Sequence, residues 1–171
     1  MRNVTNNRVE GFPPIASDRS KVLILGTMPG ELSLVTGQYY ANLRRNIFWP
    51  IMGELFGARP ALPYEKRVEI LQSAGVAVWD VLQSCVRPDS LDESITEEVV
   101  NDFPAFFAKH PSIAHVFFNG GKAQTMFRRH VLPAPTEDRY IFTCLPSTSP
   151  AHAAMRPEAK MLAWSVIKTA L

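Results

Sequence analysis

Short apolar runs that alternate with longer segments of helical periodicity limit this chain to few folds. The runs of strand length cover residues 22–27, 76–82, 115–119 and 140–145. Apolar residues at helical spacing predict helices over residues 48–56, 64–74, 97–109, 122–130 and 158–170. Strands that are apolar on both faces and alternate with helices are typical of a parallel sheet with helices on both sides. The sequence therefore predicts an α/β fold.

Size and composition are those of one globular domain. The chain has 171 residues, of which 46% are hydrophobic, so we expect a single domain over residues 1–171. Residues 1–17 are expected to form an extended N-terminal arm, because the proline pair Pro13 and Pro14 cannot join a central strand.

Composition also excludes several classes of protein. No apolar run approaches the ~18 residues that cross a bilayer, and residues 1–7 lack the apolar core of a secretion signal. We therefore expect a cytoplasmic protein without a membrane partner. The two cysteines, Cys85 and Cys144, are too few for an iron–sulfur cluster and lack metal-ligand spacing. We expect free, buried thiols, and neither a metal nor another cofactor.

The charge balance permits a nucleic-acid partner without requiring one, because the net charge is only +2. Several basic residues stand beside predicted turns and helix starts. They either form one basic face or are distributed over the solvent-exposed surface, as is common for arginine. These residues are Arg44, Arg45, Lys122, Arg128, Arg129 and Arg156.

Three loops that follow predicted strands carry the residues of chemical interest. The first, Gly26-Thr27-Met28-Pro29-Gly30, matches neither phosphate-binding glycine pattern, so a nucleotide cofactor is poorly supported. Tyr40, one of two adjacent tyrosines further along, is either a core residue or a ring that stacks on a nucleobase. In an open α/β sheet, ligands bind outside the carboxyl ends of the strands, where all three loops would emerge.

Two asparagines stand where an amide can serve either structure or chemistry. Asn46 precedes a predicted helix, where it can cap the helix N-terminus and can also hold a water molecule in the cleft. Asn119 ends the third predicted strand. It either stabilises the following glycine turn or presents a donor and an acceptor to the N–H/C=O edge that hypoxanthine and uracil share.

Five segments, in this order, resemble the hypoxanthine-DNA glycosylase branch of the uracil-DNA glycosylase superfamily. They are Gly26-Thr27-Met28-Pro29-Gly30, Tyr39-Tyr40-Ala41-Asn42, Asn46-x-Phe48-Trp49, Phe117-Phe118-Asn119-Gly120 and Leu145-Pro146-Ser147-Thr148-Ser149-Pro150-Ala151. The resemblance runs from about Val9 to the end of the chain, and its closing segment is the most specific. It implies a three-layer α/β/α sandwich with a central four-stranded parallel sheet. It also implies a monofunctional, metal-free DNA glycosylase that initiates base excision repair.

The resemblance further implies roles for individual residues. Asn46 would position the attacking water, with Asn42 as the reserve candidate. The residues expected to bind the base are Gly26, Thr27, Met28, Tyr40, Phe48 and Asn119. Those expected to bind DNA are Ser147, Thr148, Ser149, Pro150, His152 and Arg156, although a lone loop histidine such as His152 is often only solvated. The expected partner is double-stranded or single-stranded DNA with deaminated bases, bound by a monomer.

Two departures from the family pattern keep alternatives open. Mismatch-type relatives carry asparagine where this chain has Met28, and residues 42–45 make a spacer that is one residue longer than the pattern and lacks proline. Whether Asn46 or Asn42 faces the sugar is therefore undecided. A uracil-preferring double-strand glycosylase and a catalytically idle DNA-binding module stay as alternatives. An esterase or a flavodoxin-like protein is disfavoured, because the chain lacks a Gly-x-Ser-x-Gly elbow and a flavin phosphate loop.

Overall fold

The computed structural model describes residues 7–89, 91–132, 137–150 and 154–171. Its centre is a four-stranded parallel sheet of β2 (Val22–Gly26), β3 (Val76–Asp80), β6 (His115–Asn119) and β7 (Ile141–Leu145), in the order β3-β2-β6-β7. Every residue of β2 and β3 is buried, as expected for strands that are covered on both faces. The predicted parallel sheet is confirmed.

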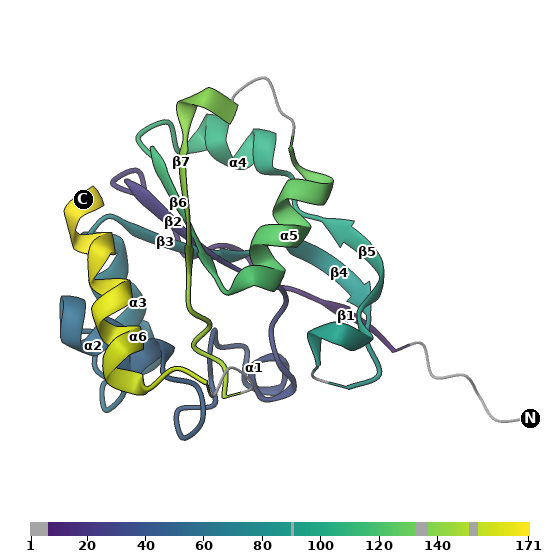
Figure 1. Cartoon of the computed structure of the whole chain (residues 1–171), viewed down its shortest axis with the longest axis horizontal. Helices are drawn as coiled ribbons and strands as arrows, with labels where there is room; N and C mark the ends of the chain where they lie inside the picture. The colour runs from purple at the N-terminus through teal and green to yellow at the C-terminus, as the bar shows by residue number, and fades with distance from the viewer. Residues whose placement is uncertain (1–6, 90, 133–136, 151–153) are drawn as a thin grey trace, which may run out of the picture.

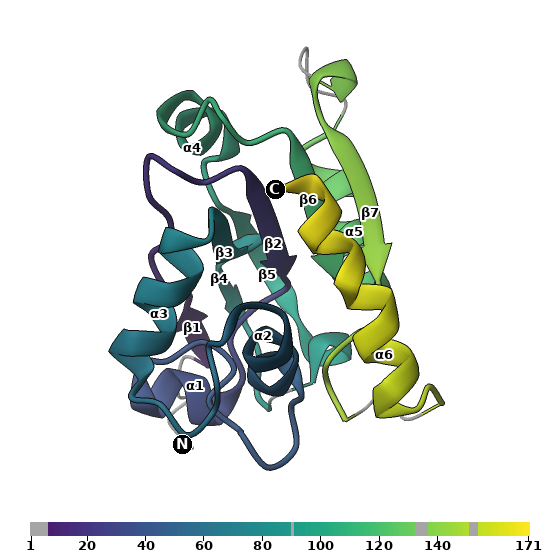
Figure 2. The same cartoon turned by 90° about the vertical axis from the view of Figure 1, so that its left-hand side faces the viewer.

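Helices cover both faces of this sheet (Figure 1 and Figure 2). On one face lie α2 (Phe48–Phe56), α3 (Tyr64–Ser73) and α6 (Pro157–Trp164), and on the other lie α4 (Phe103–Lys109) and α5 (Gly121–His130). Fully buried aromatic side chains such as Trp49, Trp164 and Phe117 fill the space between the layers. The three-layer α/β/α sandwich is therefore confirmed.

A second sheet, antiparallel and three-stranded, was not expected from the sequence. It consists of β1 (Arg8–Glu10), β4 (Leu82–Val86) and β5 (Thr96–Val100), in the order β1-β4-β5. Part of the predicted extended arm is thus a strand, and Ile15 forms a further bridge to Val78 of β3.

The predicted helix over residues 97–109 is wrong in its first part. Residues there pair with β4 as strand β5, which suits the β-branched Val99 and Val100. The helix begins only at Phe103, because Asp102 caps it: the Asp102 carboxylate accepts the N–H of Ala105 at 3.0 Å.

Four smaller differences separate the structure from the predicted elements. The last helix ends at Trp164 and continues as the 3₁₀ helix η3 (Ser165–Ala170), and a short helix, α1 (Glu31–Thr36), follows the turn after β2. The two 3₁₀ helices η1 (Asp92–Ser94) and η2 (Glu137–Arg139) lie in connections. Both cysteines are free, but only Cys85 is buried, since Cys144 is exposed on the edge strand β7.

The topology fixes where a ligand site can form. All four parallel strands end at one edge of the sheet. The chain passes from β2 to β3, which lies on one side of β2, and then crosses to β6 on the other side. Such a reversal of strand order opens a crevice beyond the carboxyl ends of the strands. No helix in the described ranges is long and apolar enough to span a membrane.

Candidate functional site

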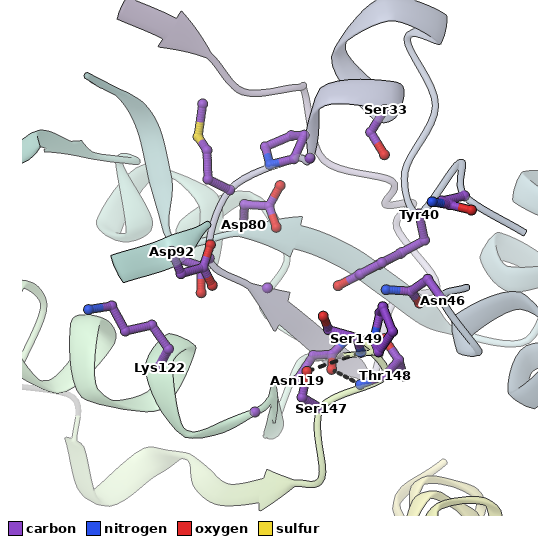
Figure 3. Close-up of a pocket in the computed structure, with 18 of the residues that line it drawn as sticks. Ser33, Tyr40, Asn46, Asp80, Asp92, Asn119, Lys122, Ser147, Thr148 and Ser149 are labelled. Atoms are coloured by element: carbon purple, nitrogen blue, oxygen red, sulfur yellow. Dashed lines mark hydrogen bonds between the residues drawn. The ribbon is translucent and has the colours of Figure 1, made fainter. Parts of the chain in front are cut away.

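A pocket of about 600 Å³ opens at the carboxyl edge of the parallel sheet, a volume in the range of small-molecule sites. The ends of three strands and the loop after the fourth contribute to its wall, through Gly26, Asp80, Asn119 and Ser147. Figure 3 shows how side chains from these segments surround one space.

Most of the residues that the sequence assigned to a site line this pocket. They are Gly26, Thr27, Met28, Tyr40, Asn42, Asn46, Asn119, Ser147, Thr148, Ser149 and Pro150. Phe48 lies behind the wall, fully buried, and Arg156 is exposed at the start of α6, away from the lining. His152 lies outside the described residues. The fold therefore brings the predicted loops together, while the roles of their residues stay predictions.

The two adjacent tyrosines have different surroundings. Tyr39 is a core residue, whose hydroxyl donates to the carbonyl of Pro13 at 2.9 Å. Tyr40 lines the pocket with a backbone φ of +52°, which few non-glycine residues adopt. Its ring stacks on that of Phe48, with the centroids 4.0 Å apart. One face of the Tyr40 ring is thus covered by Phe48, which supports it from behind.

Asn46 is oriented by the start of α2. Its Oδ1 accepts the N–H of Phe48 at 2.9 Å, and its own N–H donates to the carbonyl of Asn42 at 2.8 Å. Ile47 occupies the N-cap position, so Asn46 satisfies a helix N–H from one residue before the cap. Among the residues that the structure describes, the Nδ2 group and the second lone pair of Oδ1 make no further hydrogen bond, so they can hold a water molecule.

Asn119 is fixed in place by Thr148. Its Nδ2 donates to the Thr148 hydroxyl, and its Oδ1 accepts the N–H of Thr148, both at 2.9 Å. The Asn119 amide also lies near the Tyr40 hydroxyl and lowers the pKa of that hydroxyl in part. Within the described part of the chain, one N–H and one lone pair of the amide make no well-formed hydrogen bond and can serve a base. Thr148 is 1% exposed, and its carbonyl accepts the N–H of Ile47 at 3.2 Å. Its hydroxyl is thus occupied inside the protein, and Thr148 links the Asn119 and Asn46 segments.

The loop after β7 is held close to the turn after β6. The N–H of Gly120 donates to the carbonyl of Leu145 at 2.9 Å, and the Trp164 indole N–H donates to the carbonyl of Pro146 at 2.8 Å. Gly120 has a φ of +95°, and a Cβ atom there would lie 3.0 Å from the Cβ of Ser147. Only glycine allows this approach, which places Ser147 at the pocket wall.

Asp80 is a pocket residue that the sequence analysis missed. It ends β3, it is 4% exposed, and its Oδ2 has no hydrogen-bond partner among the described residues. Burial and then the Asp92 carboxylate raise its pKa to about 7, and the Arg87 guanidinium offsets this only in part. The signal in the sequence was a single acid at the end of an otherwise apolar run, Val76-Ala77-Val78-Trp79-Asp80.

A second carboxyl group, that of Asp92, lies close enough to Asp80 to raise its pKa. Burial raises the pKa of Asp92, while a hydrogen bond from the Thr27 hydroxyl and the charge of Arg87 lower it in part. Arg87 is 4% exposed, and its Nη2 donates to the carbonyl of Pro29, which holds the turn after β2. Among the residues that the structure describes, no group of three or more His, Cys, Asp or Glu side chains could hold a metal ion.

Comparison with known proteins gives consistent matches. The family model of the uracil DNA glycosylase superfamily matches residues 13–168. A protein named hypoxanthine DNA glycosylase from Methanosarcina barkeri is 33% identical over 115 residues, which cover 67% of this chain and 72% of that protein. A protein of the same name from Methanosarcina acetivorans is 34% identical over 114 residues, or 66% of this chain and 72% of that protein. A solved structure is also similar: the solution NMR structure of a protein assigned as a uracil DNA glycosylase from Methanosarcina acetivorans. It superposes on this chain with a TM-score of 0.76 at 28% sequence identity, and the match covers 94% of this chain and 96% of that one.

Proposed function

Because this chain belongs to the uracil DNA glycosylase superfamily, we propose that it is a DNA glycosylase that removes hypoxanthine from DNA and so initiates base excision repair. The reaction is hydrolysis of the N-glycosidic bond of one flipped-out nucleotide. It leaves an abasic site and the free base, and the enzyme acts as a monomer. Uracil and xanthine, which present the same adjacent donor and acceptor, are the secondary substrates to test.

One observation carries this proposal. A single pocket at the carboxyl edge of the sheet is lined by residues from separate loops. These include the residues that the sequence assigned to binding the base and to positioning the water. Two relatives are named hypoxanthine DNA glycosylase, and the match covers 72% of the length of each. Their names support hypoxanthine as the preferred base.

Asn46 is the proposed water-positioning residue. Cleavage of a deoxyribose N-glycosidic bond passes through a transition state with oxocarbenium character, so a well-oriented water is a sufficient nucleophile. The hydrogen bond from Phe48 fixes the Asn46 amide, and its free N–H and lone pair can orient that water at C1′. Asn42, whose carbonyl holds the backbone of Asn46, is the reserve candidate.

Asn119 is the proposed reader of the base. Hypoxanthine presents N1–H and O6 where adenine presents a bare N1 and an amino group, so one fixed amide orientation prefers hypoxanthine. The two bonds to Thr148 supply that fixed orientation. Asn119 and the backbone N–H groups near Thr27 and Met28 would also stabilise negative charge on the departing base.

Access to the pocket requires extrusion of the nucleotide from the duplex. The extrusion costs a few kcal/mol and is least unfavourable for a mispaired base, which a deaminated base usually is. Ser147, Ser149 and Pro150 lie at the pocket wall, where hydroxyl groups can bind phosphates and proline can fill the vacated space.

The proposal is tested with labelled duplexes that carry one hypoxanthine, uracil or xanthine, incubated with the protein and EDTA and then cleaved with alkali. We expect metal-independent loss of hypoxanthine, and a fall of orders of magnitude in the single-turnover rate of Asn46→Ala with duplex binding retained. The same loss in Asn42→Ala but not in Asn46→Ala would transfer the role to Asn42.

Two other results would change the assignment. Excision of uracil alone would favour a uracil-preferring enzyme, in line with the solved structure assigned as a uracil DNA glycosylase. Salt-sensitive DNA binding without cleavage of any duplex would favour an idle DNA-binding module.

A further inference from the structure

Two buried oxygen atoms in the pocket lack hydrogen-bond partners among the described residues. They are Oδ2 of Asp80 and the hydroxyl of Tyr40. The Asn119 amide lies near the Tyr40 hydroxyl and lowers its pKa in part, but does not reach hydrogen-bond geometry. A Cβ atom on Gly26 would lie 2.5 Å from Asp80 Oδ1 and 2.8 Å from the Tyr40 hydroxyl oxygen, so both side chains approach one point. An unpaired buried polar group costs about 1–3 kcal/mol, which a bound ligand can recover. These oxygens therefore mark a place where a ligand hydrogen-bonds.

The position of Asp80 indicates which part of a nucleotide it meets. Asp80 ends β3 and is only 4% exposed, and its carboxyl lies among the other pocket side chains (Figure 3). A flipped nucleotide enters with its base first, while the sugar and phosphates stay joined to the DNA at the mouth. Asp80 therefore meets the base, whereas a group that activates water must lie near C1′ of the sugar.

The surroundings of Asp80 favour its neutral form. Burial and the carboxylate of Asp92 raise the pKa of Asp80 to about 7, against the lowering effect of Arg87. The nearby Tyr39 and Tyr40 are kept neutral, because burial and Asp80 raise the pKa of both hydroxyls. An ionised Asp80 would repel the negative charge that develops on a departing base, whereas a protonated one can neutralise that charge.

We infer that Asp80, in its protonated form, is the catalytic acid that gives its proton to N7 of the departing hypoxanthine. This inference rests on the proposed function. In hypoxanthine that is substituted at N9, N1 already carries a proton, so N7 is the most basic ring nitrogen. The C1′–N9 bond breaks with its electron pair going to the base, and N7 takes the Asp80 proton, so that neutral hypoxanthine leaves. Water adds its oxygen to C1′, and its proton returns to the Asp80 carboxylate through solvent.

The test is the pH dependence of hypoxanthine excision by the wild type, Asp80→Asn and the pocket-matched control Asp92→Asn. Rates are measured with enzyme in excess of a hypoxanthine duplex but below saturation, because this regime reports the ionisation of the free enzyme. With the wild type we expect the rate to fall about ten-fold per pH unit above about pH 7. Asp80→Asn should be slower by about 10²–10⁴-fold at pH 6 and should lack this fall. Asp92→Asn should keep the fall but begin it at lower pH, because the Asp92 carboxylate raises the pKa of Asp80.

Each other outcome overturns the inference in a recognisable way. A wild-type rate that rises through neutral pH, with the rise lost in Asp80→Asn, would make Asp80 a base instead of an acid. An Asp80→Asn protein that is slow but keeps the wild-type pH profile would show a purely structural role. The wild-type profile decides even if the variant folds poorly, which melting temperatures would reveal. A wild type that is inactive on hypoxanthine at every pH would remove the proposed function, and this inference with it.

Discussion

At the scale of single residues, the buried Asp80 links the pocket to the stability of the fold. Its pKa rises from 3.8 to about 7 in the folded protein, so between these values the native state holds a proton that the unfolded chain has released. This contribution to stability is fully present below pH 3.8 and is lost as the pH rises to about 7. The total is on the order of a few kcal/mol.

Asp80→Asn should therefore stabilise the protein most at alkaline pH. We expect its free energy of unfolding to exceed that of the wild type by a few kcal/mol at about pH 8, and the gain to shrink toward zero near pH 4. Urea unfolding at both pH values measures the difference, with the exposed Asp18→Asn as the control. An equal gain at both pH values would show that the ionisation of Asp80 does not oppose folding.

Gly26 provides a steric prediction in the same part of the pocket. Its backbone conformation is one that alanine can adopt, but the added Cβ would lie 2.5 Å from Asp80 Oδ1 and 2.8 Å from the Tyr40 hydroxyl. We expect Gly26→Ala to displace these side chains and to lower hypoxanthine excision by about ten-fold or more, and overpacking to cost about 1–3 kcal/mol of stability. Gly30→Ala is the matched control, because nothing lies within 4 Å of its added Cβ. Equal losses in both variants would contradict the steric argument.

The sequence revealed those site residues whose position follows from the residues next to them in the chain. Asn46 and Asn119 stand at a predicted helix start and a predicted strand end, so their place at the sheet edge followed from local pattern. Asp80 also ends a strand, but only the tertiary structure shows that it is buried beside Gly26 and Asp92 and that Oδ2 lacks a hydrogen-bond partner in the described part of the chain. Likewise, only the three-dimensional contacts show that Phe48 lies behind Tyr40.

At the scale of elements, the link between β6 and the loop after β7 sets the orientation of Asn119. Thr148→Val keeps the backbone N–H that donates to Asn119 Oδ1 but removes the hydroxyl that accepts from Nδ2. We expect a loss of about 1 kcal/mol of stability. We also expect weaker discrimination between hypoxanthine and adenine, because the amide is then held at one end only. Unfolding and parallel excision assays on the two duplexes measure both effects.

The control for this change is Thr125→Val, which removes a threonine hydroxyl bonded within α5 to the carbonyl of Gly121. Its base preference should match that of the wild type. If Thr148→Val discriminates between the bases as well as Thr125→Val does, the bond to the Thr148 hydroxyl does not orient Asn119 for base reading.

The elements that the sequence predicted correctly are those with a strong local pattern. The four parallel strands and α2, α3 and α5 each have a continuous apolar run or a helical stripe. The antiparallel sheet was missed because its strands are short, because β1 pairs across a long stretch of chain (Arg8 with Val86), and because the β4–β5 pairing is irregular in register. For Thr96–Val100, pairing with β4 overrides the helical spacing that had extended the α4 prediction toward its N-terminus.

At the scale of the whole molecule, charge at the pocket rim should govern attraction to DNA. The net charge of the chain is only +2, so general attraction is weak, and the placement of basic groups decides the affinity. Arg45 lines the pocket and its neighbour Arg44 is exposed. Acidic residues, among them Asp92 and Glu93, lie at the same pocket. Arg45 therefore lies at the rim, with the exposed Arg44 next to it in the chain, and both can contact phosphates of DNA over the pocket.

Replacing both arginines in Arg44→Gln/Arg45→Gln should weaken duplex binding and its dependence on salt. Each lost phosphate contact lowers the slope of log K against log[salt] by about 0.9, so we expect a decrease of up to about 2. The single-turnover rate at saturating protein should change little, since neither side chain takes part in the proposed chemistry. Lys66→Gln/Lys109→Gln is the matched control: it removes the same charge from two exposed lysines that do not line the pocket. Fluorescence anisotropy across a salt series compares the two proteins. A larger loss of affinity and of salt dependence in the arginine variant places the DNA over the pocket. Equal losses in the two variants would mean that binding depends on net charge alone and that these arginines are ordinary surface residues.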